Sequence, residues 1–440
     1  MAASGINTGD TAWLLISTAL VMLMTPGLAL FYGGMVQRKN VLSTFMHCFF
    51  ALGIVTVQWA VVGYSLAFGK THGGLIGGFD YLFMNGIGLE AKDASSTVPH
   101  VLFMMYQGMF AVITPALIAG AFAERMKFSA YCMFTLLWST LVYDPLAHWV
   151  WGPDGWLVKR GALDFAGGTV VHLSSGVSAL VCAIVLGKRL GYPSRKHAPH
   201  SVTMTVTGAG LLWFGWFGFN GGSALASNGL AALAFANTHL AAAAGAVTWG
   251  LVEAFRFKKV TMLGVASGLV AGLVGITPAA GFISPMAAIA VGGLAGVVCY
   301  GGVMLKGRFG YDDALDAFGV HGVGGALGAL LTGVFAAKAF NPAGADGLLR
   351  GGTGLMLTQI IGVVAAAAFA VVLSLAILYV IDKTIGLRVT PDEEREGLDT
   401  ALHGESGYEM GSTGAGEAHY EAVEPEPAAT AIKLVTGAAR

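Results

Sequence analysis

Long apolar segments, each separated from the next by a short polar loop, make up most of the chain. A helix rises about 1.5 Å per residue, so about 20 apolar residues cross the roughly 30 Å hydrocarbon core of a bilayer. The segments that reach this length are 11–34, 43–67, 99–121, 128–147, 165–187, 200–221, 229–251, 261–282, 285–305, 314–336 and 352–382. The pattern therefore predicts an all-α integral membrane protein with eleven transmembrane helices.

Basic residues are distributed unequally between the two sets of loops. Thirteen lie on one predicted side of the membrane, namely Arg38, Lys39, Arg125, Lys127, Lys188, Arg189, Arg195, Lys196, Arg256, Lys258, Lys259, Lys306 and Arg308. Six lie on the other side, namely Lys70, Lys92, Lys159, Arg160, Lys338 and Arg350. Because cytoplasmic loops carry the excess of basic residues, the N-terminus is predicted to be outside and the tail from residue 383 to be cytoplasmic.

The composition excludes other classes of protein. Charged residues make up only 11% of the 440 residues and hydrophobic residues 55%, whereas soluble domains contain about 25% charged residues. The net charge of −1 gives no electrostatic reason to expect a nucleic-acid partner. All four cysteines lie in apolar segments, which is typical of buried thiols rather than of a disulfide framework. The N-terminus lacks the basic region of a cleaved signal peptide.

Two parts of the sequence repeat each other in the same order. The stretches "LDFAGGTVVHLSSGVSALV" and "LDAFGVHGVGGALGALL" share Leu-Asp, Phe, Gly, His and then small residues, and their histidines are 149 positions apart. Thr-Pro-Ala also occurs twice, at 114–116 and at 277–279. Two units of five spans fit this spacing, and because five is odd, the second unit must be inverted in the membrane. We therefore predict two inverted five-helix repeats followed by a long eleventh helix.

His172 and His321 occupy corresponding positions in the two repeats. Ionisable groups inside a membrane are costly and usually belong to a transport path or a proton relay. A neutral imidazole both donates and accepts a hydrogen bond, so two of them side by side could pass protons or guide a small polar solute. Alternatively, the pair could be the two axial ligands of a haem.

Asp164 and Asp316 begin the two histidine-bearing helices. A carboxylate at this position can cap a helix, because the exposed amides and the helix dipole stabilise its charge. A buried carboxylate that faces a pore would also favour a cation over an anion. Both interpretations of the two aspartates are open from the residues alone.

Aromatic residues accompany the same helices. "YQGMF" (106–110) and "WFGWFGFNGGS" (213–223) put Phe110 and Phe219 in candidate pore helices, and Trp151 lies just outside the fourth span. A tryptophan there is commonly an interfacial anchor. An indole face also attracts cations, and Ser223 could accept a hydrogen bond from such a cation.

The motifs "DFAGGTVVH", "GWFGFNGGS", "GLVGITPAAGF" and "DAFGVHGVGG", with the tail "GLRVTPDEEREGLDTALHGESGYE", recur in one known group of proteins. Over about residues 10–410 the chain resembles the ammonium transporter family (Amt/Mep/Rh), specifically its bacterial and archaeal Amt branch. The resemblance implies a homotrimer in the cell membrane, in which each eleven-span subunit has its own narrow hydrophobic pore for ammonium or ammonia. It implies no enzymatic activity, no cofactor and no metal.

The resemblance also implies roles for the residues at the outer end of the pore. Trp151, Ser223 and Phe110 would form a recruitment site for ammonium. Phe110 and Phe219 would be the stacked gate below that site.

Further roles follow for the interior of the pore. His172 and His321 would be twin histidines that line it, and Asp164 would support the site and the deprotonation of ammonium. The additional supporting positions are Gln107, Thr277 and Asp316. Moving neutral ammonia while its proton travels along the histidines would avoid the penalty for an unpaired ion in a dry pore. A potassium ion has no proton to release, so the same pore would reject it.

The C-terminal region is expected to have a regulatory part. Thr390 as a cap, Pro391 at the first helical position and the acidic residues that follow are typical of a helix start. The resemblance implies that this segment lies on the cytoplasmic face and couples the pores to a PII-type signalling protein. We therefore expect it to dock on basic loops such as Arg125–Lys127 or Lys188–Lys196.

These observations divide the chain into a transmembrane domain (1–382), a cytoplasmic regulatory segment (383–410) and a disordered tail (411–440) rich in Gly, Ala, Glu and Pro. The function they favour is ammonium transport. Two alternatives remain: an ammonium sensor that signals through its C-terminal tail, and a membrane redox protein with His172 and His321 as haem ligands.

Overall fold

The computed structural model describes residues 5–194 and 197–408, and helices account for nearly all of its regular structure. The elements of the first part are α1 (Thr8–Met35), η1 (Arg38–Asn40), α2 (Val41–Gln58), η2 (Trp59–Gly63), α3 (Tyr64–Phe68), β1 (Thr71–His72), β2 (Ile76–Gly77), η3 (Leu82–Met84), α4 (His100–Phe122), α5 (Phe128–Trp138), η4 (Ser139–Tyr143), α6 (Asp144–Trp151) and α7 (Trp156–Lys159). The two strands form a small antiparallel hairpin.

The second part is built in the same way. Its elements are η5 (Gly168–Leu173), α8 (Ser174–Leu186), α9 (Val202–Gly221), η6 (Gly222–Ala224), α10 (Gly229–Phe257), α11 (Met262–Ile276), α12 (Pro285–Phe309), η7 (Phe318–Gly322), α13 (Val323–Phe335), η8 (Leu348–Arg350), α14 (Thr353–Thr384), α15 (Pro391–Glu396) and α16 (Leu398–His403). The prediction of an all-helical membrane protein is confirmed at this level.

Most of the predicted spans correspond to single helical stretches. Within the described residues, nine stretches are long and apolar enough to cross a membrane. The fourth predicted span is the stretch Phe128–Trp151, which runs through α5, η4 and α6 and therefore ends at Trp151 rather than before it. The predicted span 261–282 is too long, because α11 ends at Ile276 and gives way to turns. Pro278 lacks the N–H that a continuing helix needs, which accounts for this early end.

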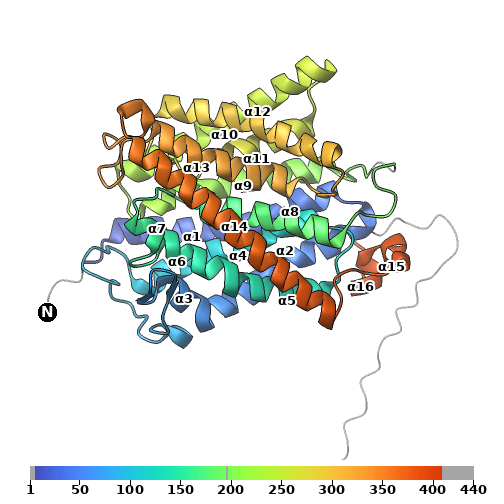
Figure 1. The fold of residues 1–440 in the computed structure, drawn as a ribbon, viewed down its shortest axis with the longest axis horizontal. Helices are drawn as coiled ribbons and strands as arrows, with labels where there is room; N and C mark the ends of the chain where they lie inside the picture. Colours follow the sequence, from blue (N-terminus) through green and yellow to red (C-terminus); the bar gives the residue numbers. More distant parts are fainter. Residues whose placement is uncertain (1–4, 195–196, 409–440) are drawn as a thin grey trace, which may run out of the picture. The chain divides into compact units, whose positions relative to one another are not determined.

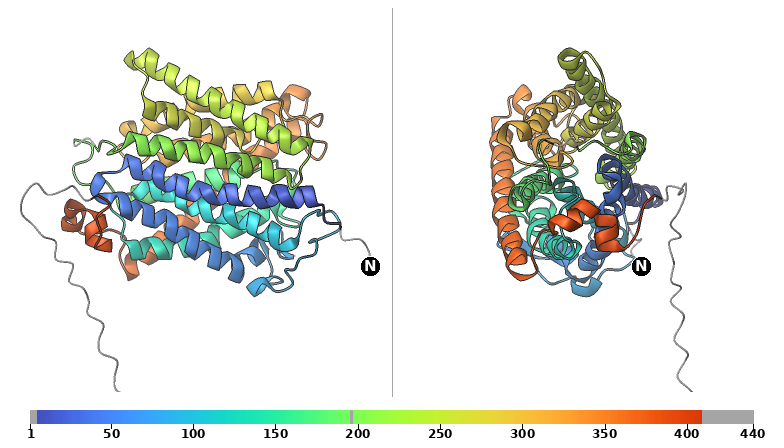
Figure 2. Two further views of the ribbon diagram at one scale, coloured as in Figure 1. Left: turned by 180° about the vertical axis from the view of Figure 1, so that it is seen from behind. Right: turned by 90° about the vertical axis from the view of Figure 1, so that its right-hand side faces the viewer.

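The helices lie side by side, with the two ends of the bundle clearly distinct (Figures 1 and 2). The short helices α15 and α16 lie at one end, which we call the tail end. Helices α6 and α7 extend toward the opposite end, which we call the Trp151 end because α6 finishes there with that residue. The long helix α14 runs obliquely across one side of the bundle (Figure 1).

Four of the helical stretches contain a wide turn with hydrogen bonds from residue i to residue i+5, at η2, η4, η5 and η7. Such turns are rare and are often found at functional sites. Two of them carry the predicted histidines: His172 lies in η5 and His321 in η7. The wide turns therefore distinguish these two helices from ordinary membrane-spanning helices.

The two histidine-bearing helices cross in close contact. A Cβ atom on Gly176 would lie 2.0 Å from the backbone N of Gly322, and one on Gly325 would lie 2.6 Å from the carbonyl O of Gly168. Any larger residue at these positions would force the helices apart, so glycine is required there. Each of these two glycines stands four residues after its own histidine. The close crossing is what brings the two imidazoles together.

Candidate functional site

The side chains of His172 and His321 face each other in the centre of the crossing. Their ring centroids are 5.4 Å apart and their planes differ by 21°. Both side chains are buried, with 1% and 4% of their surface exposed. Among the described residues, three of the ring nitrogens have no hydrogen-bond partner, namely both nitrogens of His172 and the Nδ1 of His321. The pair therefore offers polar ring atoms inside an otherwise apolar interior.

A narrow cavity lies beside the two imidazoles. Its volume is about 10 Å³, which is about the space that one water molecule needs by the same measure. The apolar side chains that enclose it come from α1, α4, α9 and α11 and include Met24, Leu28, Ile113, Leu117, Leu212 and Val270. The space is far too small for a porphyrin, so the residues do not fit the haem alternative.

Aromatic rings lead from the Trp151 end of the bundle to the histidines. Trp151 meets Phe110 edge-on with centroids 6.0 Å apart, and Phe110 is stacked at a tilt on Phe219 at 4.3 Å. Phe219 is in turn 5.9 Å from His172. The order along this line is therefore Trp151, Phe110, Phe219, His172 and His321, and the two phenylalanines separate Trp151 from the cavity.

Trp151 is held by a hydrogen bond rather than by its ring contacts alone. Its Nε1–H donates to the carbonyl O of Asp164 at 2.9 Å. Ser223, in η6, is joined to the same region by Tyr106, whose hydroxyl lies 3.2 Å from the Ser223 hydroxyl. The ring of Tyr106 packs edge-on against Phe110 at 5.0 Å. The structure thus brings Trp151, Phe110 and Ser223 to one region, and Tyr106 connects them.

Asp164 caps the helix that carries His172. Its two carboxylate oxygens accept four backbone N–H groups, from Gly167, Gly168, Thr169 and Val170, at distances of 2.7–3.2 Å. The capping interpretation is therefore correct for this residue. The same residue binds Trp151 through its backbone, so Asp164 links the start of η5 to the aromatic line.

The capping interpretation is wrong for Asp316. The carboxylate of Asp313 accepts N–H groups from Ala317 at 3.1 Å and from Phe318 at 2.8 Å, so Asp313 is the residue that caps this helix. The side chain of Asp316 forms an ion pair with Lys306 instead. The Leu-Asp match between the repeats misled the alignment, whereas the spacing of eight residues from Asp313 to His321, which equals that from Asp164 to His172, identifies the correct aspartate.

The other supporting positions are placed differently. Thr277 receives a hydrogen bond from the Nε1–H of Trp216 at 2.9 Å, and Trp216 is stacked on His172 with centroids 5.3 Å apart. Thr277 is thus connected to the pair through a tryptophan that the sequence analysis did not single out. Gln107 lies on α4 between Tyr106 and Phe110, and within the part of the chain that the structure describes its side chain makes no hydrogen bond. Tyr106 and Trp216 both lie inside the quoted motifs, but nothing in the sequence distinguishes them from the other aromatic residues of these helices.

The segment after α14 docks on the tail end of the bundle. Its helix α15 starts with the predicted cap, in which Thr390 and Glu393 form a reciprocal capping box and Pro391 follows Thr390. The backbone N–H of Lys127 donates to the carbonyl O of Leu387 at 2.9 Å, so the predicted contact with Arg125–Lys127 is confirmed.

The docked segment also reaches two further sites. Glu394 accepts a hydrogen bond from the backbone N–H of Leu190 at 2.6 Å, which confirms the contact with the loop that begins at Lys188. Arg195 and Lys196 of that loop lie outside the described residues. Asp399 accepts the N–H of Ser43 at 2.8 Å, a contact with the start of α2 that the sequence analysis did not foresee. The residues from 411 onward, predicted to be disordered, also lie outside the described part of the chain.

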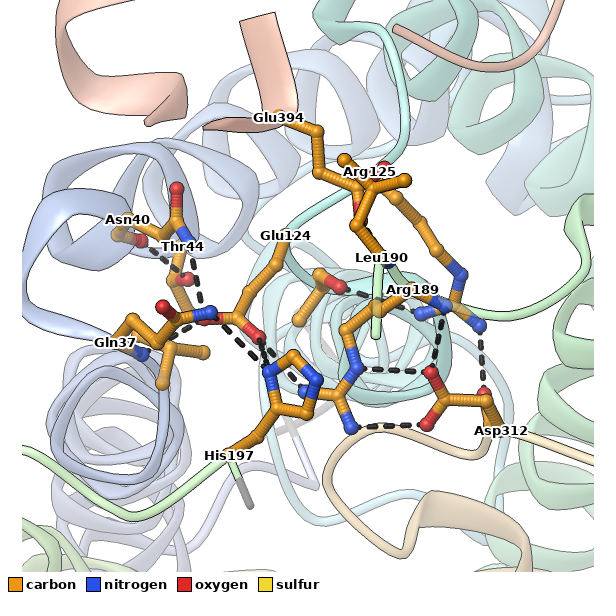
Figure 3. Close-up of polar contacts among 12 residues, drawn as sticks. Gln37, Asn40, Thr44, Glu124, Arg125, Arg189, Leu190, His197, Asp312 and Glu394 are labelled. Carbon is orange, nitrogen blue, oxygen red and sulfur yellow. Dashed lines mark hydrogen bonds and ion pairs between the residues drawn. The ribbon is translucent and has the colours of Figure 1, made fainter. Parts of the chain in front are cut away.

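A buried ion network lies beneath this docked segment (Figure 3). Arg189 lies between Glu124 and Asp312, at 2.7 Å and 2.8 Å. Burial alone would raise the pKa of both carboxyl groups, but the charge and hydrogen bonds of Arg189 lower it below the ordinary value in each case. Asn40 connects the network to the tail, because it donates to Glu124 and accepts from the N–H of Leu398. The loops and the tail segment are therefore joined into one structure.

Comparisons with known proteins agree with this geometry. A family model described as "Ammonium Transporter Family" matches residues 12–408. An ammonium transporter of Bacillus subtilis (strain 168) is 53% identical over 405 residues, which cover 92% of this chain and 99% of that protein. The crystal structure of Saccharomyces cerevisiae Mep2 has a TM-score of 0.83 and 39% identity, covering 88% of this chain and 89% of that chain.

A solved structure named "Sensor Amt Protein" is also similar, with a TM-score of 0.82 and 31% identity, covering 90% of this chain and 98% of that chain. The family match extends from α1 to the end of the docked segment, and so includes the histidine pair, the aromatic line and the tail helices. The chain therefore belongs to the ammonium transporter family, and its function is ammonium transport.

Proposed function

We propose that ammonium is recruited at Trp151, Phe110 and Ser223, loses its proton near the Phe110–Phe219 gate, and continues past His172 and His321 as ammonia. The observation that carries this proposal is the uninterrupted line of ring contacts that ends at two buried imidazoles with unpartnered nitrogens beside an apolar cavity. Cation–π attraction offsets part of the dehydration of ammonium at the first rings. Beyond the gate, only a neutral solute avoids the full cost of an unpaired charge.

The two histidines supply what neutral ammonia and its separated proton need. A neutral imidazole has one donor and one acceptor nitrogen, so it can hydrogen-bond to ammonia and can also pass a proton to its neighbour. The two rings are stacked with centroids 5.4 Å apart, and neither nitrogen of His172 bonds to His321 among the described residues, so a proton would pass between them by way of a solute or water molecule. The proton and the nitrogen thus travel through the same region as separate species.

Asp164 has a supporting role in this proposal. Its carboxylate oxygens already accept four amide N–H groups, so its main task is to fix the start of η5 and, through its carbonyl, the indole of Trp151. Its negative charge near the gate also favours the approach of a cation. Asp313 holds the other histidine-bearing helix in the corresponding way.

The two halves of the chain are inverted repeats in this proposal. Support comes from three features that both histidine-bearing helices share: a capping aspartate eight residues before the histidine, a wide turn that contains it, and a close-contact glycine four residues after it. With the final helix α14 added, two five-span units account for eleven spans. The transmembrane domain would be 1–382, the regulatory segment 383–410 and the tail 411–440.

The assembly is proposed to be a homotrimer in the cell membrane, with the Trp151 end outside and the tail end in the cytoplasm. The excess of basic residues in the loops at the tail end supports this orientation. The docked segment 386–407 offers a surface for a PII-type signalling protein, because it touches two loops and the start of α2 and would transmit a change in its position to all three. The similarity to a protein named as a sensor keeps a signalling role for the tail open beside transport.

Current measurements in liposomes that contain the purified protein test this function. Ammonium should produce a current or an ammonia flux, whereas potassium at the same concentration should not. A protein that binds ammonium but conducts neither species would instead support the sensor alternative. Equal ammonium and potassium currents would contradict selection by deprotonation.

A further inference from the structure

A second polar pair lies inside the membrane, away from the histidines. The side-chain Nε2–H of Gln58 donates to Oδ2 of Asp144 at 2.7 Å, and also to the hydroxyl of Thr140 at 3.2 Å. Gln58 ends α2 immediately before the wide turn η2, and Asp144 begins α6 immediately after the wide turn η4. A carboxyl group at this depth is costly and marks a functional position more often than a packing position.

Gln58 lines an apolar groove between α2 and α5, whereas Asp144 is fully buried and does not line it. The groove has a volume of about 780 Å³, and Gln58 and Thr140 are among the residues that line it. Its walls include Val57 and Leu141, which are 63% and 44% exposed on the surface of this chain. Asp144 and the residues of α6 up to Val150 are buried, so the Gln58–Asp144 bond acts together with side-chain packing in holding α6.

On one side, the bond is anchored to the helix that carries Phe110. Trp59, which follows Gln58, donates from Nε1 to the carbonyl O of Met104 on α4 at 3.0 Å. The indole also fits directly over Gly108, where a Cβ atom would lie 2.8 Å from it. Gly108 stands two residues before Phe110. Gln58 therefore has a fixed position relative to the gate.

On the other side, the bond holds the helix that carries Trp151. Helix α6 has eight residues, from Asp144 to Trp151. In its middle, Nδ1–H of His148 donates to the carbonyl O of Ala67 at 2.9 Å, and Nε2 lies 2.8 Å from the hydroxyl of Thr71. Asp144 therefore lies at the end of α6 that continues from η4, and Trp151 lies at the other end.

We propose that Asp144 and Gln58 are positioning residues for the outer recruitment site, because their hydrogen bond joins the helical stretch that ends at Trp151 to the helices α2 and α4, of which α4 carries Phe110. This inference rests on the proposed role of Trp151 and Phe110 in recruiting ammonium. Only one oxygen of the Asp144 carboxyl accepts a bond within the described residues, and the other has no partner. An acceptor oxygen, rather than a negative charge, is therefore the property that the pair uses.

The test compares five variants of the full chain in lipid nanodiscs and liposomes, the fifth being Trp151→Ala, which removes the indole of the recruitment site itself. Asp144→Ala and Gln58→Leu remove the bond, Asp144→Asn keeps an acceptor oxygen, and Thr140→Val is the matched control because it removes only the second, longer bond of the same Gln58. Amide hydrogen exchange of residues 144–151 reports the anchoring of α6 independently of transport. The ammonium concentration for half-maximal current reports the recruitment site, and the maximal current reports the steps beyond it.

Loss of the bond should speed amide exchange in α6 by about tenfold, as expected for the loss of one buried hydrogen bond. It should also raise the half-saturating ammonium concentration by a larger factor than it lowers the maximal current. Asp144→Asn and Thr140→Val should resemble the unmodified protein in both measurements. Three results for the variants that lack the bond would overturn the inference. The first is unchanged amide exchange in α6, and the second is equal acceleration of exchange in all helices. The third is faster exchange in α6 with an unchanged half-saturating ammonium concentration. If Asp144→Ala does not fold, Gln58→Leu and Asp144→Asn decide between these outcomes. Trp151→Ala with unchanged half-saturation would instead contradict the proposed recruitment site.

Discussion

Asp164 and Asp313 hold corresponding places before the two histidines: each lies eight residues upstream, and each carboxylate accepts backbone N–H groups from the start of the helix that follows. The two histidine-bearing helices thus begin with the same kind of cap. Because each cap is followed closely by a wide turn, an error at the cap would be transmitted to the imidazole. The precision of the histidine pair therefore depends on both aspartates.

The first prediction concerns these caps. Asp164→Ala and Asp313→Ala should each lower the free energy of unfolding by about 1–2 kcal/mol, the usual value of a helix cap, and should greatly reduce ammonium-dependent current. Asp316→Ala should have a mild effect, because it removes only a partly exposed ion pair with Lys306. Thermal unfolding and liposome currents at matched protein levels measure the two effects. Equal, mild effects of all three substitutions would show that the caps of Asp164 and Asp313 have no special bearing on the histidine pair.

The second prediction concerns the histidines. His172→Ala or His321→Ala should abolish selective ammonium transport without unfolding the protein, because each removes half of the pair while the glycine crossing remains. Liposome currents with ammonium and with potassium provide the measurement. Undiminished ammonium current in both variants would contradict the relay. Retained current with a loss of potassium exclusion would assign the pair to filtering alone.

The third prediction uses the pH dependence of the buried network at the tail end. Asp312 has a lowered pKa in the folded protein, because the bonds and charge of Arg189 outweigh the effect of burial. A lowered folded-state pKa contributes stability above the unfolded value of about 3.9, and this contribution is lost as the pH falls through the folded value. Asp312→Asn should therefore destabilise the protein by about 2–3 kcal/mol at pH 7.

The same substitution should matter less in acid, because the natural carboxyl group is then protonated as well. The difference in melting temperature between the two proteins should shrink as the pH falls below about 4. Thermal unfolding in detergent between pH 7 and pH 3 measures it. A difference that stays constant over this range would mean that the Asp312 charge contributes nothing to the network.

The positions of the spans were predictable, because hydrocarbon thickness imposes a length on every apolar segment and few alternatives satisfy it. The cap of α15 was predictable for a similar reason, since Thr390, Pro391 and Glu393 form a complete local signal. Local chemistry of this kind needs no knowledge of the rest of the fold.

Other features depend on contacts between distant segments and left little trace in the sequence. The early end of α11 is an exception, because Pro278 does mark it locally; it was missed because hydropathy continues past Ile276 although the helix does not. The hydrogen bond between Asp399 and Ser43 at the start of α2 joins residues more than 350 positions apart. No periodicity of polar and apolar residues indicates such a contact. Trp216 was passed over because a tryptophan in an apolar helix has no distinguishing pattern, and only the fold shows it stacked on His172.

The last prediction concerns the tail, whose segment 386–407 holds two loops and the start of α2 together. Deleting 386–440 removes the contacts of Leu387 with Lys127, of Glu394 with Leu190 and of Asp399 with Ser43. This deletion should reduce ammonium flux and abolish cooperation between subunits, because the loops that bear the pore helices lose their common support.

Deleting only 411–440 should leave flux and its regulation unchanged, which makes that truncation the matched control. Asp399→Ala should reproduce part of the larger effect, since it removes one of the three contacts and leaves the chain intact. Liposome flux measured for all three proteins decides the matter: if the long truncation and the point variant both behave like the full chain, docking of the segment has no bearing on transport.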